Sequence, residues 1–442
     1  MRIVVCLSVL AALTGAATAR ADEDWHAAFE KQQAEIDALR AAFAKEQRER
    51  EERLATQVRV SGFVQVDWVV HNQSSQDELN GSTGAPLNED RFDLRRGHVR
   101  LDAEKGLVLG TIEIDANTVH GPQVRPIEAQ VSVRWPEKED PRVPSVLVSA
   151  GLLRIPFGFE VQEIDWVRPF LERANMLQAL FPGEFDLGVR FLMKYRFLRW
   201  GMAVMNGSPI GSKEFPDLDP VASKEIVGRV GVDFDLVPGV RLQAGVSADT
   251  GTGFHPGSPA TKPQLVWQDQ NGDGLVEQNE IVAVGGAPAT PSQLFHRFGV
   301  GGDARLIVGL PWLGDLTLRA EAIDALNLDR GYEVADPVGA GHDLREHGWS
   351  VGGTQELTRW AMIGARYDVY NPDADASQQR ALNLVPIDRT YSTMALMAMV
   401  RDGWQRLVFE YDINRNPLGL GTSGAPTTLA DNTVTLRAQM VF

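Results

Sequence analysis

Cysteine is nearly absent from this chain of 442 residues, since Cys6 is the only one. The chain therefore cannot be held together by disulfide bonds. Beyond the extreme N-terminus there is also no run of about 18 apolar residues, which excludes a protein built from membrane-spanning helices. Cationic residues are outnumbered, because 43 Lys and Arg face 59 Asp and Glu and leave a net charge of -16. An acidic chain without a basic tail is not expected to bind nucleic acid.

The N-terminal segment, residues 1–21, has the three parts of a secretory signal peptide. Arg2 is followed by the apolar stretch Ile3–Leu13 and by the small-x-small sequence of residues 19–21. Cleavage after this sequence would leave a mature chain that begins at Asp22. A short membrane anchor is the alternative, although the apolar stretch is shorter than the about 20 residues that span a bilayer.

Residues 22–56 repeat apolar positions with the spacing of a helix. The positions that step by four and three are Trp25, Phe29, Gln32, Ile36, Leu39 and Phe43. This spacing is the seam of a coiled coil, and the other faces carry mostly charged and amide side chains. We predict an α-helical coiled-coil stalk in the periplasm, and a single helix packed on the following domain is the alternative.

From residue 57 to residue 442 the period changes to two, which is typical of β-strands with one apolar and one polar face. In the first segment Val64 and Val66 alternate with Gln65 and Asp67. Sixteen segments of this kind begin near Val58, Phe92, Leu107, Pro126, Ser145, Asp186, Trp200, Ile226, Val240, Phe298, Leu316, Trp349, Ala361, Thr390, Gln405 and Val434.

Three features favour a membrane barrel over a soluble β-sandwich, in which the apolar faces would meet inside. The segments reach about nine to eleven residues, the length that crosses an outer membrane. Tryptophans such as Trp68, Trp135 and Trp404 fall near predicted strand ends, as in an aromatic girdle. The last segment ends on Phe442 and is similar to the assembly signal of bacterial outer-membrane barrels. We therefore predict an all-β membrane barrel of about 16 antiparallel strands over residues 57–442.

If the apolar positions face lipid, many charged residues face the lumen. The cationic residues of this set include Arg59, Arg96, Arg100, Arg134, Arg190, Lys194, Arg196, Arg229, Arg241, Arg305, Arg319, Arg366, Arg406 and Arg437. The acids include Asp67, Asp102, Glu113, Asp115, Glu128, Asp233, Asp303, Glu321, Asp368 and Glu410. Arginine suits a pore for phosphate or carboxylate, because its guanidinium donates to two oxygens at once. Ion pairs that only fix the shape of the lumen are an equally physical interpretation, and both stay open.

The stretch from Ile155 to Phe185 breaks the alternation and has the spacing of a short helix. It is long enough to fold into the barrel as a constriction, with Arg168, Glu172 and Arg173 as candidate residues at the narrowing. A lid outside the barrel and a contact between subunits are the alternatives.

Residues 269–280 match the twelve-residue pattern of a calcium-binding loop. The ligands would be the side chains of Asp269, Asn271 and Asp273, the carbonyl of Leu275 and a bidentate Glu280. The flanking helices of an EF-hand are not expected, because Pro and Gly residues interrupt both sides. Calcium is thus a possible structural cofactor, and a solvated acidic loop is the alternative.

Several short segments carry a likeness to a known family. They are Phe92–Leu101 with its tandem arginines, Gly151–Glu160 with its Phe-Gly turn, Phe170–Asn175, Asp186–Val189 and the terminal Gln439–Phe442. Together they resemble the phosphate-selective porin family of Gram-negative outer membranes. The resemblance implies a sixteen-stranded trimeric porin with Arg95 and Arg96 at a central anion site, although a regular strand turns only one of the two inward. The chain departs from the anion-selective members, because no lysine follows Lys262.

These observations predict a passive outer-membrane porin for small anionic or general hydrophilic solutes, with phosphate as a candidate. The candidate pore and anion-binding residues are Arg95, Arg96, Arg100, Arg134, Arg154, Arg173 and Arg190. The expected partners are the outer-membrane bilayer and two further copies of the chain in a homotrimer. A structural tether that links the barrel to the cell wall is the alternative. An enzyme is not expected, because none of the eight histidines has a serine or carboxylate at a recognisable catalytic spacing.

Overall fold

The computed structural model describes residues 30–45, 56–72, 75–79, 86–119, 121–136, 145–212, 221–267, 276–278, 281–380, 383–420, 426–429 and 431–442. The chain divides into two compact units, Met1–Gln57 and Val58–Phe442. The predicted signal peptide lies outside the described residues.

In the first unit, residues 30–45 form an α-helix in which every residue is exposed. The exposed side chains include three positions of the predicted seam, Ile36, Leu39 and Phe43. Association of this helix with other copies stays a prediction. In the described part of the chain, no helix combines the length and the apolar character needed to cross a membrane.

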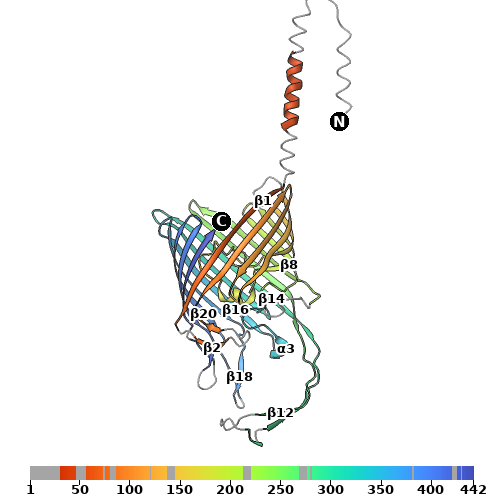
Figure 1. The fold of residues 1–442 in the computed structure, drawn as a ribbon, viewed down its shortest axis with the longest axis vertical. Coiled ribbons are helices and arrows are strands. Elements are labelled where there is room, and N and C mark those ends of the chain that lie inside the picture. The colour runs from red at the N-terminus through yellow and green to blue at the C-terminus, as the bar shows by residue number, and fades with distance from the viewer. Residues whose placement is uncertain are drawn as a thin grey trace, which may run out of the picture. The chain divides into compact units, whose positions relative to one another are not determined.

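In the second unit, sixteen strands close into one antiparallel barrel (Figure 1). Each of the sixteen predicted strand starts lies within five residues of the first residue of a barrel strand, so the predicted fold class is confirmed. The barrel strands are β1 (Gln57–His71), β4 (Arg91–Lys105), β5 (Val108–Asn117), β6 (Gln123–Trp135), β7 (Val146–Arg154), β8 (Phe185–Tyr195), β9 (Leu198–Met205), β10 (Glu225–Val237), β11 (Val240–His255), β14 (Gln293–Leu310), β15 (Gly314–Leu326), β16 (Arg345–Glu356), β17 (Ala361–Asn371), β20 (Tyr391–Asp402), β21 (Gln405–Arg415) and β24 (Thr433–Val441).

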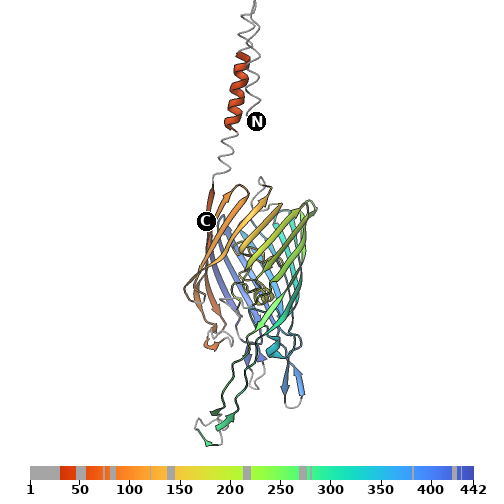
Figure 2. The same ribbon diagram turned by 90° about the vertical axis from the view of Figure 1, so that its right-hand side faces the viewer.

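The connections differ between the two ends of the barrel. Short turns join strands at the end where β1 begins and the C-terminus lies, and longer connections leave the other end (Figures 1 and 2). The longer connections contain the helix α3 (Pro337–Ala340) and four small hairpins: β2 (Ser75–Leu79) with β3 (Pro86–Asn88), β12 (Gln264–Trp267) with β13 (Ile281–Val284), β18 (Ser377–Arg380) with β19 (Asn383–Pro386), and β22 (Gly419–Leu420) with β23 (Pro426–Thr427). We call the two ends the short-turn end and the long-loop end.

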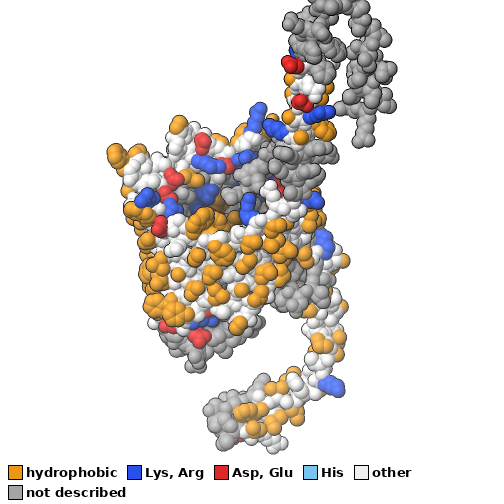
Figure 3. Space-filling model, turned by 45° about the horizontal axis from the view of Figure 1, so that its top comes forward, with side chains coloured by type: hydrophobic (Ala, Val, Ile, Leu, Met, Phe, Trp, Pro, Cys, Tyr) orange, Lys and Arg blue, Asp and Glu red, His pale blue; other side chains and the backbone are white. Residues whose placement is uncertain are grey.

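The outer face of the barrel is apolar, and the inner face is polar. In β1, Val66 and Trp68 are exposed, whereas Gln65 and Asp67 are only 1% and 3% exposed. Outward apolar side chains cover much of the barrel wall that faces the viewer in Figure 3. A soluble sandwich would bury these side chains inside, so that alternative is wrong.

Part of β6 departs from the predicted alternation. Strict alternation would place Ile127 on the apolar outer face with Val131, but Ile127 is 6% exposed, while Val131 is 59% exposed. The register against β5 shifts here, because Glu113 pairs with Glu128 whereas Ile114 pairs with Pro126. The extra residue is a β-bulge, which turns Ile127 away from the outer face.

The segment between β7 and β8 folds into the barrel (Figures 1 and 2). It contains the short helix α2 (Asn175–Leu180) and is buried in two apolar clusters. In one cluster Phe157 and Leu177 pack with Leu328, and in the other Phe170 packs against inward side chains of β20 and β21, such as Met397. The prediction of a constriction is thus supported over a lid outside the barrel. We call residues 155–184 the constriction segment.

The C-terminal strand closes the barrel, because β24 pairs with both β1 and β21. The backbone of Phe442 exchanges two hydrogen bonds with Gly62, of 2.8 and 2.9 Å. Deleting Phe442 should therefore remove most of the folded, heat-modifiable barrel from the outer-membrane fraction, measured by the gel shift between heated and unheated samples. Trp404→Ser, an exposed aromatic at a turn, is the control and should leave the shift intact. An unchanged amount of folded barrel after the deletion would contradict the expectation.

Candidate functional site: the constriction

Wall carboxylates hold the constriction segment by its backbone. Glu321 on β15 accepts hydrogen bonds from the backbone N–H groups of Phe159 and Glu160, at 3.2 and 3.3 Å. On β21, Glu410 accepts from the N–H of Leu171 at 3.1 Å. These contacts satisfy buried N–H groups that an irregular segment cannot pair with itself. Similar bonds run from Gly158 to Ser247 and from Asn175 to Asp368, so the segment touches the wall from β11 to β21.

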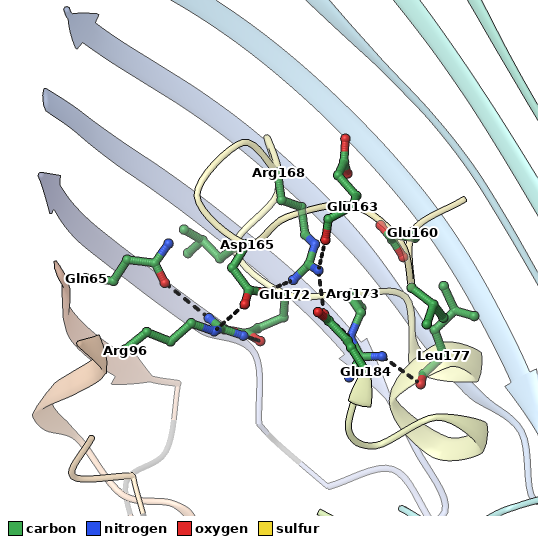
Figure 4. Close-up of polar contacts among 12 residues, drawn as sticks. Gln65, Arg96, Glu160, Glu163, Asp165, Arg168, Glu172, Arg173, Leu177 and Glu184 are labelled. Atoms are coloured by element: carbon green, nitrogen blue, oxygen red, sulfur yellow. Dashed lines mark hydrogen bonds and ion pairs between the residues drawn. The ribbon is translucent and has the colours of Figure 1, made fainter. Parts of the chain in front are cut away.

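Glu172 of the constriction segment forms ion pairs with three arginines of the barrel wall (Figure 4). Its carboxylate accepts from Arg95 Nε at 2.8 Å, from Arg96 Nη2 at 3.1 Å and from Arg437 Nη2 at 2.9 Å. Burial by itself raises the pKa of Glu172, but the three guanidinium groups hold that pKa well below its ordinary value. Arg437 also makes two 2.7 Å hydrogen bonds to Asp67, which links the segment to β24 and β1.

Both tandem arginines face inward, contrary to the expectation that Arg95 points away from Arg96. Leu94 hydrogen-bonds with Thr118, and the regular pairing of β4 with β5 resumes at His98. Three residues of β4 therefore lie opposite two residues of β5, which is a β-bulge. The bulge adds one residue to the alternation, so the two consecutive side chains reach the same carboxylate.

A second cluster closes the base of the constriction segment (Figure 4). Glu184 pairs with Arg154, with Arg168 at 2.8 Å and with Arg173 at 3.4 Å. Arg173 also donates to the carbonyls of Leu177, Phe181 and Pro182, which close α2 and the turn after it. These residues stabilise the segment itself, and Arg168 and Arg173 are buried.

The remaining candidate arginines lie on the wall of β4, β6 and β8. Arg100 pairs with Asp102 and Glu113, each at 3.0 Å, and with Glu128. Arg134 pairs with Glu104 near the short-turn end. Arg190 donates to the carbonyl of Arg154 at 2.7 Å and to Gln130 at 3.4 Å, and within the described residues it makes no ion pair with a carboxylate.

His98 lies on the barrel wall in β4, two residues before Arg100. Its Nδ1 lies 2.7 Å from Glu113 and its Nε2 lies 3.4 Å from Asp115. The sequence shows no such pairing, because the three residues come from two strands. The ring also packs on Phe63, with centroids 4.3 Å apart. This arrangement ties β4 to β5 inside the lumen.

Two further arginines meet the tip of the constriction segment. Arg319 Nη1 donates to Glu163 at 2.7 Å, and Arg305 lies 3.8 Å from the same carboxylate. Both guanidinium groups pack over the ring of Phe159, at 4.2 Å for Arg305 and 5.6 Å for Arg319. The alternation of β14 and β15 predicts that these arginines face inward. Their partners were missed, because nothing in the sequence shows where the segment crosses the lumen.

A metal site is not found among the residues that the structure describes, where no group of three potential ligand side chains gathers. The predicted calcium ligands Asp269, Asn271, Asp273, Leu275 and Glu280 lie outside these residues. Calcium binding by that loop stays a prediction.

Comparison with protein-family models gives no match. Comparison with curated proteins gives no match either. Solved structures do match: the outer membrane channel DcaP of Acinetobacter baumannii (TM-score 0.53, 12% identity, 88% of this chain and 98% of that one), the anion-selective porin from Comamonas acidovorans (0.50, 11%, 88% and 100%) and the trimer form of OmpT from Vibrio cholerae (0.50, 10%, 88% and 100%). At such identities the matches show the fold, which is that of outer-membrane barrels. The resemblance to the phosphate-selective family stays a prediction.

Glu172→Gln tests the electrostatic role of this centre. The change removes the charge that Arg95, Arg96 and Arg437 share. We expect the reversal potential in a KCl gradient across a planar bilayer to move toward anions. Asp315→Asn, which removes an exposed charge at the start of β15, is the matched control and should cause no shift. A move toward cations, or equal effects of the two variants, would show that Glu172 does not set the local field.

Proposed function

We propose that the protein is a passive porin of the outer membrane. The observation that carries the proposal is a closed barrel, apolar outside and polar inside, whose lumen is narrowed by a segment tied to the wall. An apolar outer face is compatible with contact to lipid, and a closed sheet leaves no unpaired strand edge in the membrane. The solved barrels with the same fold support the outer-membrane location. Solutes would move down their gradients with no chemical step.

The finer proposal is that small anions, phosphate among them, are preferred. Arg190 without a carboxylate partner in the described residues, and two arginines around the single carboxylate of Glu163, support this preference. Pairing of Arg95, Arg96 and Arg100 with acids works against it, because paired guanidinium groups are partly neutralised. The balance favours a general porin for hydrophilic solutes with a moderate anion preference.

Current measurements in planar bilayers test the anion preference. Arg96→Ala/Arg100→Ala should shift the reversal potential toward cations and weaken the block of KCl current by added phosphate, because the paired acids keep their charge. Arg95→Ala should act in the same direction, since the bulge in β4 turns it toward Glu172. Arg345→Ala, an exposed arginine at the long-loop end, is the control. An unchanged reversal potential in the double variant would leave these arginines a structural role alone, and the absence of any conductance would contradict the porin itself.

We also propose that the chain forms trimers, with the stalk of residues 22–56 as one contact. The exposed apolar side chains of the helix at residues 30–45 support it, as does the trimer form recorded for OmpT of Vibrio cholerae. The same exposed helix is what favours the alternative, a tether to the cell wall.

Deleting residues 22–56 should weaken the trimer, measured by cross-linking in detergent, and leave single-channel conductance nearly unchanged, because the lumen lies within the second unit. A control variant with Leu39→Ala and Phe43→Ala alone should show part of the same loss. Undiminished cross-linking in both variants would exclude the stalk as a contact. Loss of cell-wall attachment with intact trimers would support the tether.

A further inference from the structure

Two rows of side chains lie next to each other on the inner face of β15, β16 and β17. In the first row Glu321 pairs in register with Ser350, and Ser350 with Asp368. In the second row Arg319 pairs with Gly352, and Gly352 with Arg366. The rows are two residues apart along each strand, about 7 Å, and therefore share one face. Each row thus has a small residue in its centre and charges of one sign on both sides.

The small central residues leave a hollow that the constriction segment covers. The hollow is lined by Ser350 and Gly352, by Arg319, Arg366 and Glu321, and by Phe159, Glu160 and Phe170 from the segment. The aromatic rings hold the two guanidinium groups, because Arg319 lies 5.6 Å from the ring centre of Phe159 and Arg366 lies 5.0 Å from that of Phe170. We call this space the β15–β17 pocket.

The basic side of the β15–β17 pocket contains a buried hydrogen-bond donor that is not used. Arg319 Nη1 is used by Glu163 and Arg366 Nη1 by the carbonyl of Glu172, each at 2.7 Å. Arg319 Nε is buried and, among the described residues, makes no hydrogen bond, whereas Arg366 Nε lies 3.2 Å from the carboxylate of Asp368. Buried donors without an acceptor are costly, so a ligand that supplies an acceptor is favoured there.

The acidic side of the pocket contains a buried carboxyl group without a cationic partner among the described residues. Glu321 is 7% exposed and accepts two backbone N–H groups, but it makes no ion pair within the part of the chain that the structure describes. Glu160 lines the same space and, among the described residues, forms an ion pair with one cation, Arg366, at 3.4 Å. A buried carboxylate of this kind favours a cationic group beside it.

We propose that the β15–β17 pocket binds a small zwitterionic solute of the amino-acid type as it passes the constriction. The carboxylate of the solute meets Arg319 and Arg366, and its ammonium group meets Glu321 and Glu160. A simple anion satisfies only the basic row and a simple cation only the acidic row, so a solute with both charges has the complementary pattern. This inference rests on the proposed function, because it assigns a solute class to the same lumen.

Saturation-transfer NMR on the folded protein in detergent tests the pocket with three probes: glycine, acetate and methylammonium. Glycine carries both charges and the other two carry one each. We expect transfer to glycine and several-fold weaker transfer to acetate and to methylammonium. Equal transfer to glycine and acetate, or to glycine and methylammonium, would overturn the zwitterion assignment.

Two variants change the pocket in different ways. Glu321→Gln removes the carboxyl group that would face the ammonium group of the solute but keeps an acceptor for the segment. Gly352→Ala fills the hollow without changing charge. A Cβ on Gly352 would lie 3.1 Å from the carbonyl oxygen of Ala365 and 3.1 Å from Arg366 Cβ, so only a small adjustment is required. Both variants should lose the glycine signal, whereas Asp315→Asn should keep it. Transfer that survives in both variants would overturn the pocket, and heat-modifiability on gels verifies that each variant is folded.

Conductance separates this inference from the proposed function. Normal channel conductance with no transfer to glycine would overturn the pocket and leave the porin. Transfer to glycine that both variants abolish, in a protein with no conductance, would overturn the porin and leave a binding site.

Discussion

The ion pair between Glu172 and three wall arginines is the interaction on which the constriction depends. A carboxylate carried into a barrel loses hydration, and this loss is tolerated only where cations replace the water. Arg95, Arg96 and Arg437 supply those cations from β4 and β24, close to where the first and last strands meet. The same contact therefore positions the constriction segment and reinforces the seam that closes the barrel.

Apolar packing and backbone hydrogen bonds hold the rest of the segment. Phe157 and Leu177 are fully buried in a cluster that includes Leu328 from the connection between β15 and β16. That connection covers α2 directly, because the N–H of Arg330 donates to the carbonyl of Ala179 and Tyr332 Oη donates to Asn175. A segment held by both packing and ion pairs has few alternative positions, which suits a constriction of fixed shape.

Most arginines named at the constriction are paired with acids, and this limits what the number of arginines says about selectivity. A guanidinium that forms a bidentate pair offers fewer donors to a passing anion than one whose donors are free. Arg190 on β8 and Arg319 beside Glu321 depart from this pairing within the described residues, because Arg190 makes no ion pair with a carboxylate and Arg319 Nε makes no hydrogen bond. Solute preference in such a channel follows from unmatched groups at particular places and not from the net charge of the chain.

The sequence by itself determined the barrel, its sixteen strands and, away from the bulges in β4 and β6, the face that each strand turns inward. Alternation is a local property of a strand, so it can be recognised in the sequence of that strand alone, without its distant partners. The tertiary structure alone decided which charges meet. Glu172 contacts residues 77, 76 and 265 positions away in the chain, and no local pattern encodes such distances. Likewise, the bulge that turns both Arg95 and Arg96 inward depends on how β4 pairs with β5, because a strand alone does not reveal where its partner lacks a residue.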